Sequence, residues 1–384
     1  MSSDVAFIYD KALLNYHFHD EHPFNQKRVL LTKELLEESN QLDRTNILVP
    51  RVATDEEISL IHDPKYIHAV KSASFLNHEQ LIRFGLDTDD TPAFPNMHEA
   101  SASIVGATLT AVDAVLKEGA RAAVNFSGGL HHGFKQKASG FCIYNDAAIA
   151  IKYIRKQFNL RVLYVDTDAH HGDGVQWAFY EDPNVCTFSI HETGRYLFPG
   201  TGNVNERGIK AGHGYSFNLP IDAFTQDKSF IEVYQTALRE IAEFFKPDII
   251  LTQNGADAHF YDPLTHLCCS MEIYNVIPQI ALEISNTYCQ GRWIALGGGG
   301  YDIWRVVPRA WAQIWNVMKD GKSSEGELPP TWLAKWRPES PVTLLRMWED
   351  SVEDIPIIPR KQEIEEKNYV TLTNLLKYTK VKRS

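Results

Sequence analysis

The segment at residues 162–174 constrains what this chain can fold into more than any other segment. Residues 162–165 are an apolar run of the kind that forms a buried strand. Asp166, Asp168 and His170 follow at every second position, and side chains two apart in an extended chain point to the same side. Two carboxylates and one imidazole directed to one point suit a divalent metal ion with an open position for water or substrate. The alternative interpretation is a strand that runs into an acidic, solvated turn.

Three further apolar segments, at 122–126, 248–253 and 292–296, also read as strands that end in reactive side chains. The side chains that follow them are, in turn, His131 with His132, Asp257, and Tyr301. In open parallel α/β sheets, ligands bind outside the carboxyl ends of the strands. Four strands that carry such groups at the same end therefore predict an active site and not four solvated loops.

Helical patterns alternate with these strands. Helices are expected at 28–38, 97–117, 146–158, 230–245 and 271–288. The helix at 146–158 would join the strands at 122–126 and 162–165 into a βαβ unit. The alternation predicts a single α/β domain with a mostly parallel β-sheet flanked by helices.

We expect a catalytic domain at residues 1–318 and a C-terminal part at residues 319–384. A chain of 384 residues that is 44% hydrophobic can build one large core. The polar residues after 318 are typical of a linker. Beyond them, Trp332, Trp336 and Trp348 predict an extension that packs on the catalytic domain.

Composition narrows the function classes. The five cysteines are odd in number and lack a repeated CxxC spacing, which favours a reducing cytosol over a disulfide framework. The N-terminus shows no secretory signal, and no uncharged apolar run reaches the length of a membrane span. A net charge of −11 disfavours direct binding to nucleic acid. We therefore expect a cytoplasmic protein that binds neither nucleic acid nor membranes; no sequence signal sets its oligomeric state.

A series of motifs resembles the zinc-dependent histone deacetylase family, and most closely its bacterial acetoin-utilization members. The motifs are His-Pro-Phe-Asn-Gln-Lys-Arg (22–28), Gly-Gly-Leu-His-His-Gly (128–133), Gly-Phe-Cys-Ile-Tyr-Asn-Asp (140–146), Asp-Thr-Asp-Ala-His-His-Gly-Asp-Gly (166–174), Phe-Pro-Gly-Thr-Gly (198–202), Gly-Ala-Asp-Ala (255–258) and Gly-Gly-Gly-Gly-Tyr-Asp (297–302). They occur in the order found in the family, which makes them more specific than any single motif. The resemblance implies an arginase/deacetylase-like fold and hydrolysis of an acetyl amide.

The resemblance also implies which metal ions the protein binds and which residues hold them. Asp168, His170 and Asp257 would hold the catalytic metal. Zinc sites use histidine or cysteine more often than two aspartates, so Fe²⁺ is a second candidate, and the family favours Zn²⁺. A K⁺ or Na⁺ site is implied around Asp166, Asp168, His170 and Ser189, largely through backbone carbonyls.

Hydrolysis of an amide needs proton carriers, and paired imidazoles are suited to this task. By resemblance, His132, oriented by Asp173, is the general base and then the acid. His131, paired with Asp166, would stay protonated and act electrostatically. Tyr301 would donate a hydrogen bond to the oxyanion of the tetrahedral intermediate.

The remaining family positions concern the substrate and the product. The expected channel for the acyl-lysine stem is formed by Gly140, Phe141, Phe198 and Leu264, although phenylalanine is more often a core residue. Asp90 resembles the rim aspartate that holds the substrate backbone; Asp89 is the alternative alignment, and a solvated turn is the other interpretation. Arg28 resembles the arginine of an internal acetate channel, with a structural salt bridge as the alternative.

These residues predict a zinc-dependent deacetylase that acts on acetyl-lysine in a protein and releases acetate. The resemblance implies a role in acetoin or butanediol catabolism, with an acetyl-coenzyme A synthetase as a candidate substrate. An acetylpolyamine deacetylase, acting on a small acetyl-amine, is the alternative. A two-metal ureohydrolase is disfavoured because Asp257-Ala258-His259 offers only one acid. A catalytically inactive acetyl-lysine-binding module is disfavoured because His131, His132 and Tyr301 are all present.

Overall fold

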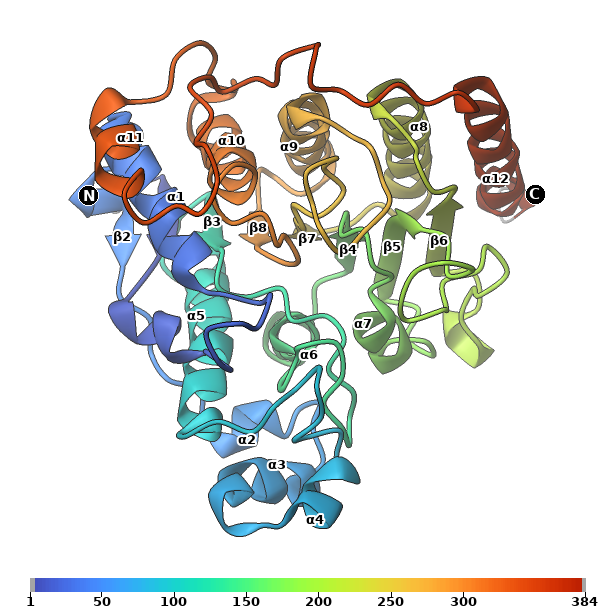
Figure 1. Cartoon of the computed structure of the whole chain (residues 1–384). Helices are drawn as coiled ribbons and strands as arrows, with labels where there is room; N and C mark the ends of the chain where they lie inside the picture. Colours follow the sequence, from blue (N-terminus) through green and yellow to red (C-terminus); the bar gives the residue numbers. More distant parts are fainter. Residues whose placement is uncertain (1–3, 382–384) are drawn as a thin grey trace.

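Eight parallel strands form a single sheet in the computed structural model, which describes residues 4–381 (Figure 1). The strands lie in the order β2-β1-β3-β8-β7-β4-β5-β6. Their bounds are β1 (Val5–Ile8), β2 (Ile47–Leu48), β3 (Ala122–Asn125), β4 (Val162–Asp166), β5 (Val185–Glu192), β6 (Ser216–Ile221), β7 (Ile249–Gln253) and β8 (Trp293–Leu296). The predicted α/β class with a parallel sheet is confirmed.

Helices cover both faces of this sheet (Figure 1). On one face lie α1 (Lys27–Glu38), α8 (Asp227–Phe245), α9 (Met271–Tyr288) and α10 (Val307–Asp320). On the other lie α5 (Met97–Leu116), α6 (Asp146–Phe158) and α7 (Asp173–Ala178), with the short helices α2 (Asp55–Ile58), α3 (Pro64–Lys71) and α4 (His78–Ile82) beyond them. The chain ends in α11 (Pro330–Trp336) and α12 (Lys361–Val381).

The strands read as continuous apolar runs because both faces of the sheet are buried. In β4, Leu163 and Val165 belong to the core under α8, α9 and α10, whereas Val162 and Tyr164 belong to the core under α5 and α6. This alternation directs successive side chains to opposite faces. The polar groups of the site therefore lie at the strand ends, outside both cores.

The connection from β3 through α6 to β4 does not place these two strands side by side. β8 and β7 lie between them, so the expected βαβ unit encloses two strands that come later in the chain. As a result, β3, β8, β7 and β4 are four consecutive neighbours in the sheet. These are the four strands whose ends carry the predicted reactive side chains.

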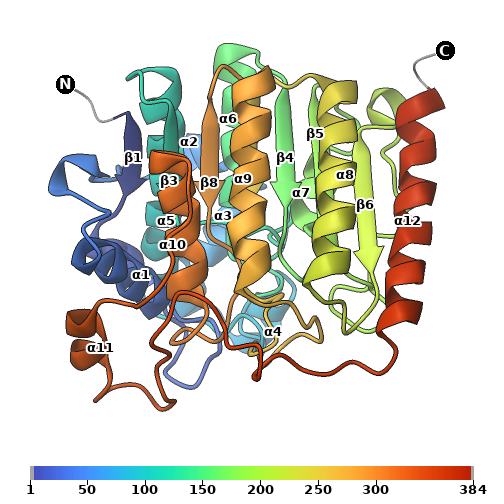
Figure 2. The same ribbon diagram turned by 90° about the horizontal axis from the view of Figure 1, so that it is seen from above.

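The C-terminal segment crosses the molecule. Trp332, Trp336 and Trp348 are buried in the same core cluster as residues of α1 and α10. Beyond α11 the chain runs along the edge at which β4 and β6 end, and it then enters α12 (Figure 2). α12 packs beside α8 and β6.

One helix, α5, is long and apolar enough to cross a membrane by length and composition. However, 72% of its apolar window is buried inside the protein. It packs against β1, β3 and α6, so it is a core helix of this fold.

Candidate active site

Three side chains from the ends of β4 and β7 form a group that can hold a metal ion. The ligand atoms of Asp168, His170 and Asp257 all lie within 4.8 Å of one another. His170 Nδ1 lies 3.1 Å from Asp168 Oδ1 and 3.0 Å from Asp257 Oδ2. Although burial opposes it, these two carboxylates raise the pKa of His170 well above its usual value. The two carboxylates that favour a proton on His170 also favour a metal cation bound in its place.

The other oxygen of each carboxylate is occupied by N–H donors. Gln253 Nε2 and the Gly299 amide each donate to Asp168 Oδ2 over 2.7 Å. The Ala169 amide donates to Asp257 Oδ1 over 2.8 Å. Each aspartate thus directs one fixed oxygen away from the group and one toward His170, which fits a single divalent cation.

Sequence reasoning missed these supporting residues. Gln253 is the last residue of β7 and pairs with Asp166 in the register of β4 and β7. At Gly299 a Cβ atom would lie 2.1 Å from Asp257 Oδ2, so only glycine permits this approach of the backbone. The glycine run at 297–300 is the one signal in the sequence that pointed to such crowding.

Two buried imidazole–carboxylate pairs lie beside this group. His131 Nδ1 is 2.8 Å from Asp166 Oδ2, which also accepts a hydrogen bond from the Tyr164 hydroxyl. His132 Nδ1 is 2.7 Å from Asp173 Oδ1. The ring centroids of the two histidines are 4.0 Å apart, so their charge states influence one another.

The environment separates the pKa values of the two histidines. Burial alone would lower the pKa of His131, but the charges of Asp166 and Asp168 outweigh it and raise the value to about 9. Burial and the neighbouring His131 lower the pKa of His132 to about 4, despite Asp173. Near neutrality one ring is therefore a cation and the other a neutral base. Such divergence within one site is typical of acid–base catalysts.

Hydrogen bonds with Asn145 and Asp146 hold the His131–His132 segment in place. Asn145 Nδ2 donates to the carbonyl oxygens of His131 and Gly133 over 3.1 and 3.0 Å. Asp146 accepts the amides of Gly129 and Leu130. Asn145 is the N-cap of α6 and Asp146 is its first residue, so the start of this helix holds the backbone of the His131–His132 segment.

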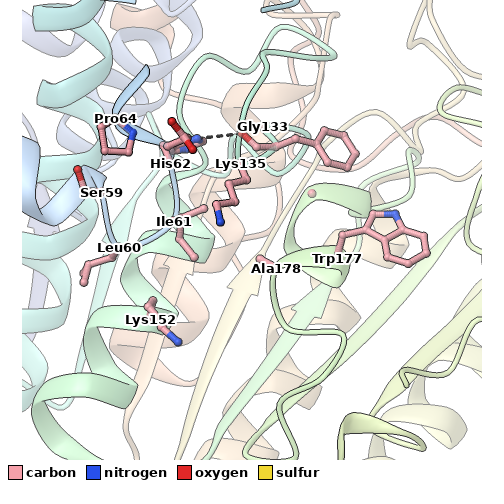
Figure 3. Close-up of a pocket in the computed structure, with 13 residues that line it drawn as sticks. Ser59, Leu60, Ile61, His62, Pro64, Gly133, Lys135, Lys152, Trp177 and Ala178 are labelled. Carbon is pink, nitrogen blue, oxygen red and sulfur yellow. Dashed lines mark hydrogen bonds between the residues drawn. The ribbon is translucent and has the colours of Figure 1, made fainter. Parts of the chain in front are cut away.

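His62 connects this anchor to a surface pocket of about 510 Å³ (Figure 3). Its Nδ1 contacts the carbonyl oxygen of Phe134 at 2.9 Å, and its Nε2 accepts the Asn145 amide over 2.9 Å. Gly133 and Gly174 line the pocket, each directly after a residue of the His132–Asp173 pair. The pocket lining thus adjoins the backbone of both residues of this pair.

Aromatic rings frame the approach to the site. The Phe198 ring is 5.1 Å from that of His132, and the Phe141 ring is 5.8 Å from that of Tyr301. Gly140 packs closely against the first of these pairs, because a Cβ there would lie 2.5 Å from His132 Cδ2 and 2.9 Å from Phe198 Cε1. Phe198 is 43% exposed, which is unusual for a core phenylalanine and typical of the rim of a cleft.

The structure also gives the environment of Asp89, Asp90 and Leu264. The side chains of Asp89 and Asp90 are both exposed. The carbonyl oxygen of Asp90 lies 3.3 Å from His22 Nε2, and the His22 ring packs 4.7 Å from that of Phe141. This contact joins Asp90 to the aromatic wall. Leu264 is half-buried in the loop after β7 that also contains Asp257.

Comparison with known proteins agrees with this geometry. The sequence profile of the histone deacetylase domain matches residues 22–318. This chain belongs to the histone deacetylase family. It is 57% identical to the acetoin utilization protein AcuC of Bacillus subtilis over 97% of each chain, and 46% identical to AcuC of Staphylococcus aureus MRSA252 over 95% of each. The resemblance seen in the motifs is confirmed.

Solved structures of the family have the same fold. A histone deacetylase homologue from Aquifex aeolicus is 28% identical, with a TM-score of 0.83 over 95% of this chain and 99% of that one. A structure described as a histone deacetylase homologue complexed with SAHA matches equally well. The predicted arginase/deacetylase-like fold is thereby confirmed.

Arg28 is fully buried beside this family site. Its Nη1 donates to the Gly300 carbonyl over 2.9 Å, and its guanidinium lies over the rings of Phe24 and Trp311 at 4.3 and 5.0 Å. Its Nε and Nη2 have no hydrogen-bond partner among residues 4–381, and no carboxylate within that range forms a salt bridge with it. Burial lowers its pKa to about 10, so it remains a cation. A buried cation with free donors is a suitable anion site.

Ser189, the expected contributor to a K⁺ or Na⁺ site, pairs with Asp166 across β4 and β5. Its hydroxyl lies 2.8 Å from His191 Nδ1. A hydroxyl that donates one hydrogen bond keeps its oxygen lone pairs, so both this oxygen and the backbone carbonyl can contribute to a cation site.

Proposed function

We propose that this protein is a zinc-dependent deacetylase that hydrolyses the acetyl amide of acetyl-lysine in a protein and releases acetate in the cytoplasm. The observation that carries the proposal is the pairing of a metal-binding group with two imidazoles whose pKa values are shifted in opposite directions. Asp168, His170 and Asp257 hold one Zn²⁺; Fe²⁺ fits the same donors. When bound, the metal polarises the amide carbonyl and lowers the pKa of water.

The side chains around the metal manage the protons. Neutral His132, oriented by Asp173, accepts a proton from the attacking water and then donates one to the leaving lysine nitrogen. His131 remains a cation beside Asp166 and stabilises the negative charge that develops nearby. Burial and nearby carboxylates raise the pKa of Tyr301, so its hydroxyl remains protonated and donates to the oxyanion.

The walls of the site account for the substrate and the product. Phe141 and Phe198 enclose the four methylenes of an acetyl-lysine, whose positive charge acetylation has removed. Asp90 accepts hydrogen bonds from the substrate backbone at the rim. Arg28 receives the acetate product with its free donors. A K⁺ or Na⁺ near Ser189 reinforces the loop that contains Asp166, Asp168 and His170.

The physiological setting follows from the relatives. Proteins 57% and 46% identical to this chain are named acetoin utilization proteins. We therefore propose a role in acetoin or butanediol catabolism, in which an acetyl-coenzyme A synthetase is the protein substrate. Removal of the acetyl group would restore the charge and the hydrogen-bond donors of its lysine.

The test is turnover by the purified, zinc-loaded protein on acetyl-lysine peptides, on an acetylated acetyl-coenzyme A synthetase and on acetylpolyamines. We expect stoichiometric acetate release and a higher kcat/KM for the acetyl-lysine substrates. A higher kcat/KM for acetylpolyamines than for every acetyl-lysine substrate would instead establish the polyamine alternative. Elemental analysis should find one zinc per chain, and two metal equivalents would contradict the single-site geometry.

A further inference from the structure

A pocket of about 540 Å³ lies at the edge of the sheet where β5 and β6 end. The loops that follow β5, β6 and β7 form one side of it, and the C-terminal segment at the start of α12 forms the other. This segment runs along the edge where the strands end (Figure 2). The lining residues that matter here are Tyr196, Phe224, His266, Ile358, Pro359 and Ile364.

Two of the loops that line the pocket also carry residues expected in the substrate channel. Tyr196 lies two residues before Phe198, and His266 lies two residues after Leu264. Two residues span at most roughly 7 Å, so the backbone at these pocket residues lies within that distance of the expected channel residues. The Phe224 amide donates to the His266 carbonyl over 2.9 Å, which joins the two loops.

The charged groups at the pocket are already paired with one another. Lys367 lies 3.0 Å from both Asp222 and Glu363, and Arg360 lies 2.6 Å from Glu363. The unpaired surface is apolar and aromatic, with Tyr196 62% exposed and Phe224 49% exposed. Such a lining gains most from an uncharged, apolar ligand.

We propose that this pocket receives a large apolar side chain of a polypeptide substrate, located within about three residues of the acetyl-lysine. This inference rests on the proposed deacetylase function and specifies its substrate class. One wall is built by residues beyond 318, outside the segment that the family profile matches. The C-terminal segment is thus a specificity element of the site. An acetylpolyamine has no side chain to place in it.

The first test uses the wild-type protein and acetyl-lysine peptides that carry leucine, phenylalanine, alanine or glutamate at each flanking position in turn. At one position, leucine or phenylalanine should raise kcat/KM about tenfold over alanine, as expected for burial of a large apolar side chain. Equal kcat/KM values at every position would overturn the inference while leaving the deacetylase activity established. No turnover even of a capped acetyl-lysine would remove the proposed function and this inference together.

The second test uses two pocket variants and a control. Tyr196→Ala and Phe224→Asn should abolish the apolar preference but leave kcat/KM for capped acetyl-lysine unchanged. Asparagine is chosen at Phe224 because the backbone there has φ of +64°, a conformation that asparagine tolerates. Ile357→Ala is the control, since Ile357 is 94% exposed and does not line the pocket. Retention of the preference in both pocket variants would contradict the assignment.

Discussion

The active site and the junction with the C-terminal segment contain the same pair of groups in different charge states. In the site, His131 lies 2.8 Å from Asp166; at the junction, His259 Nε2 lies 2.8 Å from Asp350 Oδ2. All four side chains are buried. Yet the pKa of His131 is raised to about 9, whereas burial lowers the pKa of His259 below its usual value.

The surrounding charges explain this contrast. A second carboxylate, Asp168, faces His131, so the excess negative charge favours an imidazolium. At the junction, Arg309 lies 2.8 Å from Asp350 and already balances that carboxylate, so His259 remains neutral. A geometrically similar pair can thus supply a cation for catalysis or connect two segments. The net charge of its neighbours decides between these roles.

The largest expected effect concerns the site. His132→Ala removes the proton carrier, and kcat for acetyl-lysine hydrolysis should fall about 10²- to 10⁴-fold. The zinc content should match that of the wild type, because His132 is not in the metal-binding group. A kcat within about tenfold of wild type, with zinc retained, would exclude His132 as the general base.

At the junction, Asp350→Asn should lower the free energy of unfolding but leave the catalytic rate unchanged. The substitution leaves Arg309 buried without its charge partner, which typically costs about 3–5 kcal/mol. Unfolding in urea should show this loss, while kcat per folded molecule remains close to wild type. Glu283→Gln is the matched control: Glu283 forms an exposed ion pair with Arg239, and loss of that pair should cost at most about 1 kcal/mol. Equal losses in the two variants would refute the buried role of Asp350.

The effect of residues that hydrogen-bond to the metal ligands can be tested without changing the ligands themselves. Gln253→Leu removes one of the two donors to Asp168 Oδ2 and should weaken zinc affinity about 10- to 100-fold. Competition with a chelator measures this change. Gln313→Leu is the control, because Gln313 is equally buried but bonds to Ser324 outside the site. Unchanged zinc affinity in Gln253→Leu would mean that Gly299 alone positions Asp168.

The smallest effect is the acid dependence of stability. Burial opposes it, but hydrogen bonding by His259 and the charge of Arg309 lower the pKa of Asp350 below its ordinary value of 3.8. The unfolded chain therefore binds the proton first as pH falls. The contribution of Asp350 is complete above that ordinary value and is lost below it, by at most about 1.4 kcal/mol per pH unit. Asp350→Asn should remove this slope from urea unfolding measured between about pH 5 and about pH 3; a persistent slope would assign it to other carboxylates.

Local sequence patterns predicted the elements well. The helices expected at 146–158 and 271–288 have those bounds as α6 and α9. Asp168, His170 and Asp257 form one group, as the family resemblance implied, but Asp166, which the alternate spacing placed with Asp168 and His170, pairs with His131 instead. The helix bounds depend on residues close together in the chain, where side-chain periodicity reports the secondary structure directly. The catalytic roles of His131, His132 and Tyr301 remain predictions that the geometry supports.

The sequence by itself thus determined a parallel α/β fold, the family, and the side chains available at the strand ends. Only the tertiary structure decided that β8 and β7 lie between β3 and β4, which brings four distant loops together. It also decided that the pKa values of His131 and His132 shift in opposite directions, and that Arg28 has no carboxylate partner among residues 4–381. It further decided that the C-terminal segment lines a pocket together with the loops after β5, β6 and β7. The physical reason is that pKa values and pockets depend on charges and surfaces from segments far apart in the chain, and no local pattern encodes their distances.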